Sequence, residues 1–138
     1  MIKISEVSKS YGGVVALNNV SFTVEGKSIH GLIGPNGSGK TTLLNIVSGL
    51  DSPGAGQLAL NGKSIRGLPA HSIAAEGLAR TYQNIRLFQN LTVEENVALG
   101  RHRHFGGVWS SLHLSYKTGT YIGEEDRRVI DDLLHWVG

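Results

Sequence analysis

The sequence contains no cysteine, no long apolar run and no long run of one charge. The absence of cysteine excludes a disulfide framework and thiolate metal sites. No apolar stretch approaches the roughly 20 residues that a membrane-spanning helix needs. The formal net charge of the 138 residues is only +2, so nucleic acid is not expected as a partner. Because Met1 leads directly into a strand pattern instead of a signal peptide, we expect a soluble intracellular protein with one domain.

One stretch fits the phosphate-loop (Walker A) pattern of glycines followed by lysine and threonine. It predicts a phosphate site made of Gly34, Pro35, Asn36, Gly37, Ser38, Gly39, Lys40, Thr41 and Thr42. The glycines allow backbone conformations that are closed to residues with a Cβ atom, so that the N–H groups of the loop can converge on an anion. Lys40 is expected to reach the β- and γ-phosphates, and the Thr41 hydroxyl to bind Mg²⁺.

The segments around this loop decide whether the match is meaningful. The apolar run Ile29–Ile33 precedes the loop and predicts a buried strand. Apolar residues at helical spacing follow it from Leu43 to Leu50, with Gly49 and Pro53 available to end a helix. A flexible glycine turn with an incidental lysine is the alternative, and it does not require this order of strand, loop and helix.

Other periodic segments predict a small antiparallel sheet beside the phosphate-loop strand. Apolar residues alternate in residues 2–7 and 20–24, as in half-buried strands. Leu58–Ile65 predicts a hairpin with Asn61-Gly62 in a type I′ turn, and Leu78–Tyr82 predicts a further strand.

Three helices are expected outside this core. Pro69 stands near the start of a short helix that reaches Glu76. Thr92–Glu95 is a capping box at the start of the second helix. Residues 124–137 begin with acidic residues and carry an apolar stripe. The polar, histidine-containing segment 101–121 has no such pattern and predicts a solvated loop.

Three stretches resemble the ATP-binding subunits of ABC transporters: Tyr11–Leu17, the phosphate loop, and Arg80–Phe88. The last, with Leu91–Val97 after it, is most similar to the ATPases of branched-chain amino acid importers. The resemblance implies the α/β fold of a P-loop NTPase. It assigns residues 1–90 to an antiparallel β subdomain and the phosphate-loop strand and helix of the core, up to the Q-loop. It assigns residues 91–138 to the start of a helical subdomain.

The resemblance also implies roles for individual residues. Tyr11 matches the aromatic residue that stacks on adenine, and a tyrosine that only packs against a strand end is the alternative. Gln83 matches the Q-loop glutamine, an oxygen ligand of Mg²⁺ that senses the γ-phosphate, the alternative being an ordinary polar residue. Lys40 and Gln83 are then the expected catalytic residues, and Thr41 and Gln83 the metal ligands.

Residues 84–88 match the surface that meets the membrane subunit in this family. Their apolar side chains, Ile85, Leu87 and Phe88, fit an exposed contact surface and a buried core equally well.

ATP and Mg²⁺ are the ligands that the resemblance implies. The implied partners are transmembrane permease subunits, a second ATPase subunit in a homodimer or heterodimer, and indirectly a periplasmic or extracellular solute-binding protein. This would place the protein on the cytoplasmic face of the cell membrane. The family's acidic Walker B motif, signature sequence and switch histidine are not found in the 138 residues. We therefore expect a truncated nucleotide-binding domain that binds ATP weakly and hydrolyses it negligibly alone.

Three other functions are compatible with a phosphate loop. The first is an ABC-type ATPase of DNA repair or translation. The second is a GTPase or small kinase, although Asn61-Gly62-Lys63 does not supply the guanine-reading Asn-Lys-x-Asp motif. The third is a structural or regulatory module whose nucleotide site is not formed. Nucleotide binding separates the third function from the others.

Overall fold

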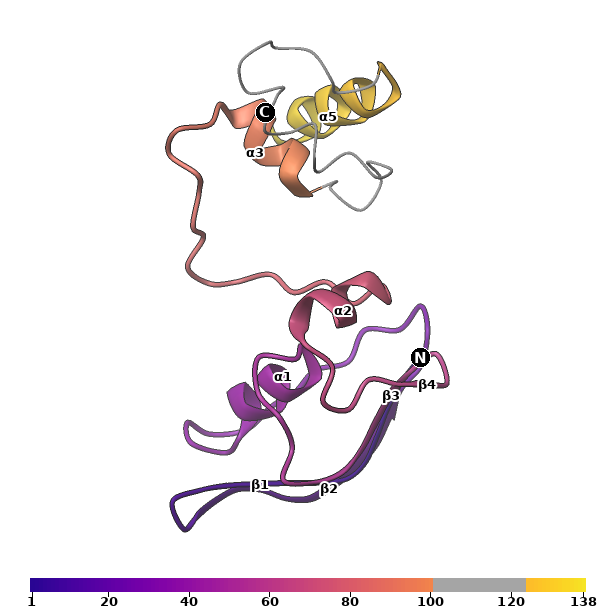
Figure 1. Ribbon diagram of the computed structural model, residues 1–138, viewed down its shortest axis with the longest axis vertical. Coiled ribbons are helices and arrows are strands. Elements are labelled where there is room, and N and C mark those ends of the chain that lie inside the picture. Colours follow the sequence, from indigo (N-terminus) through magenta and orange to yellow (C-terminus); the bar gives the residue numbers. More distant parts are fainter. Residues whose placement is uncertain (101–123) are drawn as a thin grey trace. The chain divides into compact units, whose positions relative to one another are not determined.

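The chain forms two compact units, Met1–Thr81 and Tyr82–Gly138, in the computed structural model (Figure 1), which describes residues 1–100 and 124–138. The solvated loop predicted for residues 101–121 lies outside the described residues. No helix among those described is both long and apolar enough to cross a membrane.

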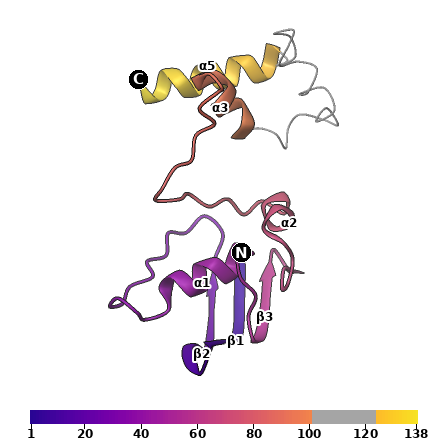
Figure 2. The same ribbon diagram turned by 60° about the vertical axis from the view of Figure 1, so that its left-hand side comes forward.

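An antiparallel sheet of four strands in the order β2-β1-β3-β4 forms the base of the first unit (Figure 2). The strands are β1 (Ile2–Tyr11), β2 (Val14–Val24), β3 (Ala55–Leu60) and β4 (Lys63–Ser64). Ile4 lies opposite Phe22 of β2 and Leu58 of β3, so apolar side chains from three strands meet on one face. The strands predicted for residues 2–7 and 20–24 are confirmed.

The hairpin between β3 and β4 is also confirmed. Leu60 pairs with Lys63, which leaves Asn61 and Gly62 as a two-residue turn. Their φ angles are 50° and 82°. Both positive angles are typical of the type I′ turn, whose twist matches that of the flanking strands.

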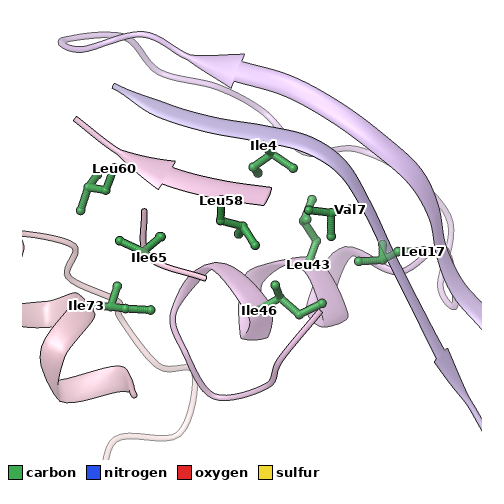
Figure 3. Close-up of a cluster of buried hydrophobic side chains, with 9 residues drawn as sticks. All are labelled: Ile4, Val7, Leu17, Leu43, Ile46, Leu58, Leu60, Ile65 and Ile73. Atoms are coloured by element: carbon green, nitrogen blue, oxygen red, sulfur yellow. The ribbon is translucent and has the colours of Figure 1, made fainter. Parts of the chain in front are cut away.

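Two helices cover one face of this sheet, α1 (Lys40–Val47) and α2 (Ala70–Ala75). Figure 3 shows Leu43 and Ile46 of α1 pointing toward side chains of β1 and β3, with Ile73 of α2 beside Ile65. The buried core consists of Ile4, Val7, Leu17, Leu43, Ile46, Leu58, Leu60, Ile65 and Ile73. Burial of this one-sided apolar face is what holds α1 on the sheet.

Helix α1 ends at Val47, and Gly49, which the sequence offered as a residue to end it, closes the C-terminal turn. The N–H of Gly49 donates to Ile46 O at 3.1 Å, and the N–H of Leu50 donates to Asn45 O at 2.9 Å. This pair of bonds is a Schellman motif, which satisfies carbonyl groups at the end of the helix. The short helix predicted after Pro69 is α2, and Pro69 is its N-cap.

Two predicted strands are wrong. Ile29–Ile33 is irregular, and Ile29 and Ile33 are 103% and 94% exposed. An apolar run forms a strand only where a neighbour accepts its backbone hydrogen bonds, and no strand within residues 1–100 pairs with this one. Leu78–Tyr82 is not a strand either. Instead, the Arg80 side chain binds the end of α1, with Nη1 2.9 Å from Asn45 Oδ1.

The second unit contains α3 (Val93–Gly100) and α5 (Glu124–Val137), which pack against each other. The capping box is confirmed, because Thr92 N–H donates to Glu95 Oε2 at 2.6 Å and Glu95 N–H donates to Thr92 Oγ1 at 3.2 Å. The helix predicted for residues 124–137 is α5. Its stripe is buried at Ile130, whereas Val137 remains 72% exposed.

Candidate functional site

The phosphate-loop residues form a tight turn that leads into α1. Gly39 is the N-cap of α1, with a φ of 86°. A Cβ atom on Gly39 would lie 2.4 Å from Ala16 O and 2.8 Å from Leu17 Cδ2, so only glycine fits against β2 here. Gly34 does not have a positive φ, contrary to the prediction, and its constraint is space, because a Cβ atom would lie 2.6 Å from Ser38 Oγ.

The ammonium of Lys40 lies inside this turn. Its Nζ atom donates hydrogen bonds to Gly34 O and Pro35 O, both at 2.7 Å, and lies 3.4 Å from Ser38 Oγ. The side chain therefore reaches back over the residues that precede its own helix. A positive charge is held where the loop closes, which is the arrangement that an incoming polyphosphate requires.

The first turn of α1 adds to this positive region. It contains no acidic residue, and no side chain of the described residues caps it. The first N–H groups of a helix have no partner within the helix, and they carry the positive end of its macrodipole. Thr41 is exposed in this turn and Thr42 is half-buried. The loop and the turn together can bind an anion and leave a hydroxyl group beside it.

Tyr11 stands at the end of β1 and is tied to the segment after α1. Its hydroxyl group donates a hydrogen bond to Asp51 Oδ2, and 46% of the residue is exposed. This hydrogen bond raises the pKa of Tyr11 above its ordinary value. Lys9 Nζ lies 2.6 Å from Asp51 Oδ1. Hydrogen bonds from Lys9, Tyr11 and the Ser52 N–H lower the pKa of Asp51 from 3.8 to about 2.

Gln83 belongs to the second unit, whereas the phosphate loop belongs to the first. It is exposed in the irregular segment before α3. Its assignment as a metal ligand therefore depends on its sequence context.

The apolar residues after Gln83 are exposed, so their interpretation as buried core is wrong. Ile85, Leu87 and Phe88 are 79%, 68% and 63% exposed. A groove of about 450 Å³ lies beside them, lined by Leu87, Phe88, Gln89, Leu91, Val93, Asn96 and Val97.

Asn96 of α3 fixes the wall of this groove. Its Oδ1 atom accepts the Phe88 N–H at 3.0 Å. Its Nδ2 atom donates to Phe88 O at 3.2 Å and to Thr92 O at 2.8 Å. The apolar segment is thus held against the start of α3 by one amide side chain.

Lys9 and Asp51 were not predicted as site residues. One signal was present in the sequence, because Asp51 closely follows the C-terminal end of a predicted helix. A carboxylate is unfavourable near the negative end of the macrodipole unless a cation or another donor accompanies it. The identity of those donors depends on contacts between residues 42 and 40 positions apart, which no local pattern predicts.

Comparison with known proteins places this site in a family. A family model described as "ABC transporter" matches residues 17–138. The chain is 38% identical over 137 residues to the high-affinity branched-chain amino acid transport ATP-binding protein BraF of Pseudomonas aeruginosa, covering 99% of this chain and 52% of BraF. It is 41% identical over 99 residues to the sulfate/thiosulfate import ATP-binding protein CysA of Mesostigma viride, covering 72% of this chain and 28% of CysA.

Solved structures show the same fold. A dimeric ATP-binding cassette in a post-hydrolysis state, bound to ADP and Pi, superposes with a TM-score of 0.72 at 27% identity, over 98% of this chain and 56% of that one. The fold of an ABC ATPase, of which the antiparallel sheet is a part, is therefore confirmed. The chain spans about half the length of BraF. The phosphate loop, the fold and the matches together establish that this chain belongs to the ABC transporter family, as part of an ATP-binding cassette.

Proposed function

We propose that this chain binds the triphosphate of Mg²⁺-ATP with its phosphate loop and the adenine base with Tyr11. The observation that carries the proposal is the position of the Lys40 ammonium, 2.7 Å from Gly34 O and Pro35 O at the start of α1. A cation, a helix N-terminus without acidic residues and a glycine turn are the three features that bind phosphate groups. Tyr11 offers a partly exposed aromatic ring to a base.

The residues also fit a bound Mg²⁺ ion. The Thr41 hydroxyl is an exposed oxygen donor next to Lys40, and hard cations prefer oxygen ligands. Gln83 would supply an amide oxygen from the segment before α3. When bound, the ion neutralises charge on the transferring phosphoryl group. Lys40 would hold the transferring phosphoryl group and stabilise the negative charge that develops on it.

In the longer protein, we assign this site to ATP hydrolysis coupled to solute import. The names of BraF and CysA refer to the transport of different solutes, and the greater coverage of BraF favours branched-chain amino acids. The proposed partners are a second ATPase subunit and transmembrane permease subunits, at the cytoplasmic face of the membrane. A role in DNA repair or translation has no support from the small net charge of +2.

The exposed groove beside Phe88 is the proposed contact surface for the permease. Its lining is mainly apolar and it is held by the hydrogen bonds of Asn96, as expected of a preformed docking site. Phe88→Ser should reduce co-purification with the permease subunits of the same transport system. Val137→Ser, at a similarly exposed apolar position on α5 outside the groove lining, serves as the control. Equal retention by both variants would remove the groove from the proposal.

A titration with Mg²⁺-ATP tests the nucleotide site. Lys40→Ala should abolish saturable binding because it removes the only cation of the loop Gly34–Thr42. Lys3→Ala removes an exposed lysine from β1 and should bind as the wild type does. If Lys40→Ala binds ATP as tightly as Lys3→Ala, the phosphate loop is not the nucleotide site.

A further inference from the structure

Three side chains from two separate parts of the first unit meet after the end of α1. Tyr11 and Lys9 come from the end of β1, and Asp51 comes from the segment that follows α1. Asp51 Oδ2 accepts the Tyr11 hydroxyl, and Asp51 Oδ1 accepts Lys9 Nζ at 2.6 Å and the Ser52 N–H at 2.7 Å. Lys9 Nζ also donates to Ser52 O at 2.7 Å. Asp51, Lys9 and Ser52 each take part in at least two of these bonds, so the acceptor of the Tyr11 hydroxyl is itself held in place.

This cluster restricts the ring of Tyr11 in two ways. The hydrogen bond to Asp51 fixes the hydroxyl end of the ring, while the backbone of β1 fixes the other end. The remaining freedom is rotation about the long axis of the ring. Lys9 Nζ lies 4.9 Å from the ring centroid, and a cation over an aromatic face favours one such rotation. One face of the ring therefore meets the ammonium, while 46% of the residue stays exposed to a flat partner.

The same cluster connects the ring to the phosphate-loop helix. The N–H of Asp51 donates to Asn45 O of α1 at 3.3 Å, and the Schellman motif directly precedes it. The Thr42 side chain in the first turn of α1 is near enough to the Tyr11 hydroxyl to lower its pKa, against the larger raising effect of Asp51. The ring is held relative to the helix whose start binds phosphate, and a nucleotide needs base and triphosphate contacts at a fixed separation.

We propose that Lys9 and Asp51 are positioning residues that hold the Tyr11 ring in one orientation for stacking on the nucleotide base. The inference goes beyond the proposed nucleotide function and depends on it. Neither residue belongs to the phosphate loop Gly34–Thr42, so their contribution should appear only with ligands that carry a base. Pre-ordering of the ring removes part of the entropy that base binding would otherwise cost.

Asp51→Asn is the first test, because it removes the negative charge that pairs with Lys9 and leaves one acceptor oxygen where Lys9 and Tyr11 now use one oxygen each. ATP and inorganic tripolyphosphate are titrated separately into the 138-residue chain. Stacking of one base contributes enough for roughly a tenfold change in affinity. Tyr11→Ala should therefore weaken ATP by about tenfold, and Asp51→Asn or Lys9→Met by about threefold. Tripolyphosphate affinity should change by less than about twofold in each case.

Two further variants separate positioning from a structural effect. Tyr11→Phe keeps the ring but loses the bond to Asp51, so its ATP affinity should match that of Asp51→Asn. In the Tyr11→Ala background, Asp51→Asn should have no additional effect on ATP, because the ring that it positions is gone. The inference would be overturned if Asp51→Asn weakened the affinities for ATP and tripolyphosphate equally. It would also be overturned if Asp51→Asn weakened ATP binding as much in the Tyr11→Ala background as it does in the wild type.

The proposed function fails in a different way. If Lys40→Ala binds tripolyphosphate as the wild type does, or if the wild type binds neither ligand, the phosphate site itself is absent and the inference falls with it. If Lys40→Ala loses both ligands while Asp51→Asn and Lys9→Met bind ATP normally, the nucleotide site stands and only the positioning role is wrong.

Discussion

Arg80 Nη1 donates a hydrogen bond of 2.8 Å to the hydroxyl oxygen of Ser48, the buried C-cap residue of α1. The same hydroxyl group donates to Leu44 O at 2.7 Å, so Ser48 uses its oxygen as both acceptor and donor. A cation at the C-terminal end of a helix is favourable because the macrodipole is negative there. Arg80 thus anchors the segment that leads toward Gln83 onto the helix of the phosphate loop.

We expect Arg80→Met to lower the free energy of unfolding of the first unit by about 2 kcal/mol, because Ser48 and Asn45 lose charge-assisted hydrogen bonds. Urea denaturation followed by circular dichroism measures the change. Arg66→Met, at an exposed position of the same unit, should stay within about 0.5 kcal/mol of the wild type. Equal destabilisation by both variants would show that the contacts of Arg80 contribute nothing.

Gly39→Ala should destabilise the first unit and abolish tripolyphosphate binding. The left-handed backbone costs about 1–2 kcal/mol for a residue with a Cβ atom. The 2.4 Å approach to Ala16 O adds a clash with backbone that cannot be relieved by a rotamer change. Gly37→Ala is the matched control, since its φ of 83° is similar but a Cβ atom there meets nothing within 4 Å. If the two variants had the same free energy of unfolding, the close approach of Gly39 to β2 would not contribute to stability.

Leu58 lies at the centre of the core in Figure 3 and is 2% exposed. Leu58→Ala should reduce the free energy of unfolding by about 2–5 kcal/mol, because it removes buried methyl groups and leaves a cavity. Val14→Ala removes methyl groups from a strand residue that is 69% exposed, and it should change stability by less than about 0.5 kcal/mol. Urea titrations of the two variants decide the comparison, and similar midpoints would contradict the assigned core.

The lowered pKa of Asp51 predicts an acid-dependent loss of stability. The pKa is about 2 in the folded chain against an ordinary value of 3.8, so the folded state favours the ionised carboxylate. The resulting stabilisation is fully present above about pH 4 and is lost as the pH falls toward about 2. Asp51→Asn, which cannot ionise, should lack this component. Urea titrations between pH 6 and pH 2 should therefore converge for the two proteins, and parallel curves would contradict the prediction.

Local patterns predicted the local structure well. The turn at Asn61-Gly62, the capping box at Thr92 and the use of Gly49 to terminate α1 each depend on a few neighbouring residues, and each is confirmed. The strand at Ile29–Ile33 was wrong because strand formation requires a paired neighbour, and apolar composition alone does not supply one.

In the candidate site too, local features could be predicted from the sequence, whereas contacts between distant residues could not. The order of loop and helix at Lys40 followed from the sequence motif, whereas the bonds of Tyr11 to Asp51 and of Arg80 to Ser48 join residues far apart in the chain. Periodicity carries no information about such pairs. The roles of Tyr11, Lys40, Thr41 and Gln83 toward nucleotide, and the division of the chain into residues 1–90 and 91–138, stay predictions.

The bonds of Lys40 to its own loop make phosphate binding an exchange reaction. Before the ammonium can turn all three of its N–H donors toward a ligand, it must release Gly34 O and Pro35 O, each held at 2.7 Å. A monovalent anion offers too little charge to replace two strong carbonyl partners, whereas a triphosphate with its charge spread over several oxygens replaces both. We therefore expect the loop to discriminate by charge: its own carbonyl groups compete with common cellular anions, and a ligand of high charge density displaces them most readily.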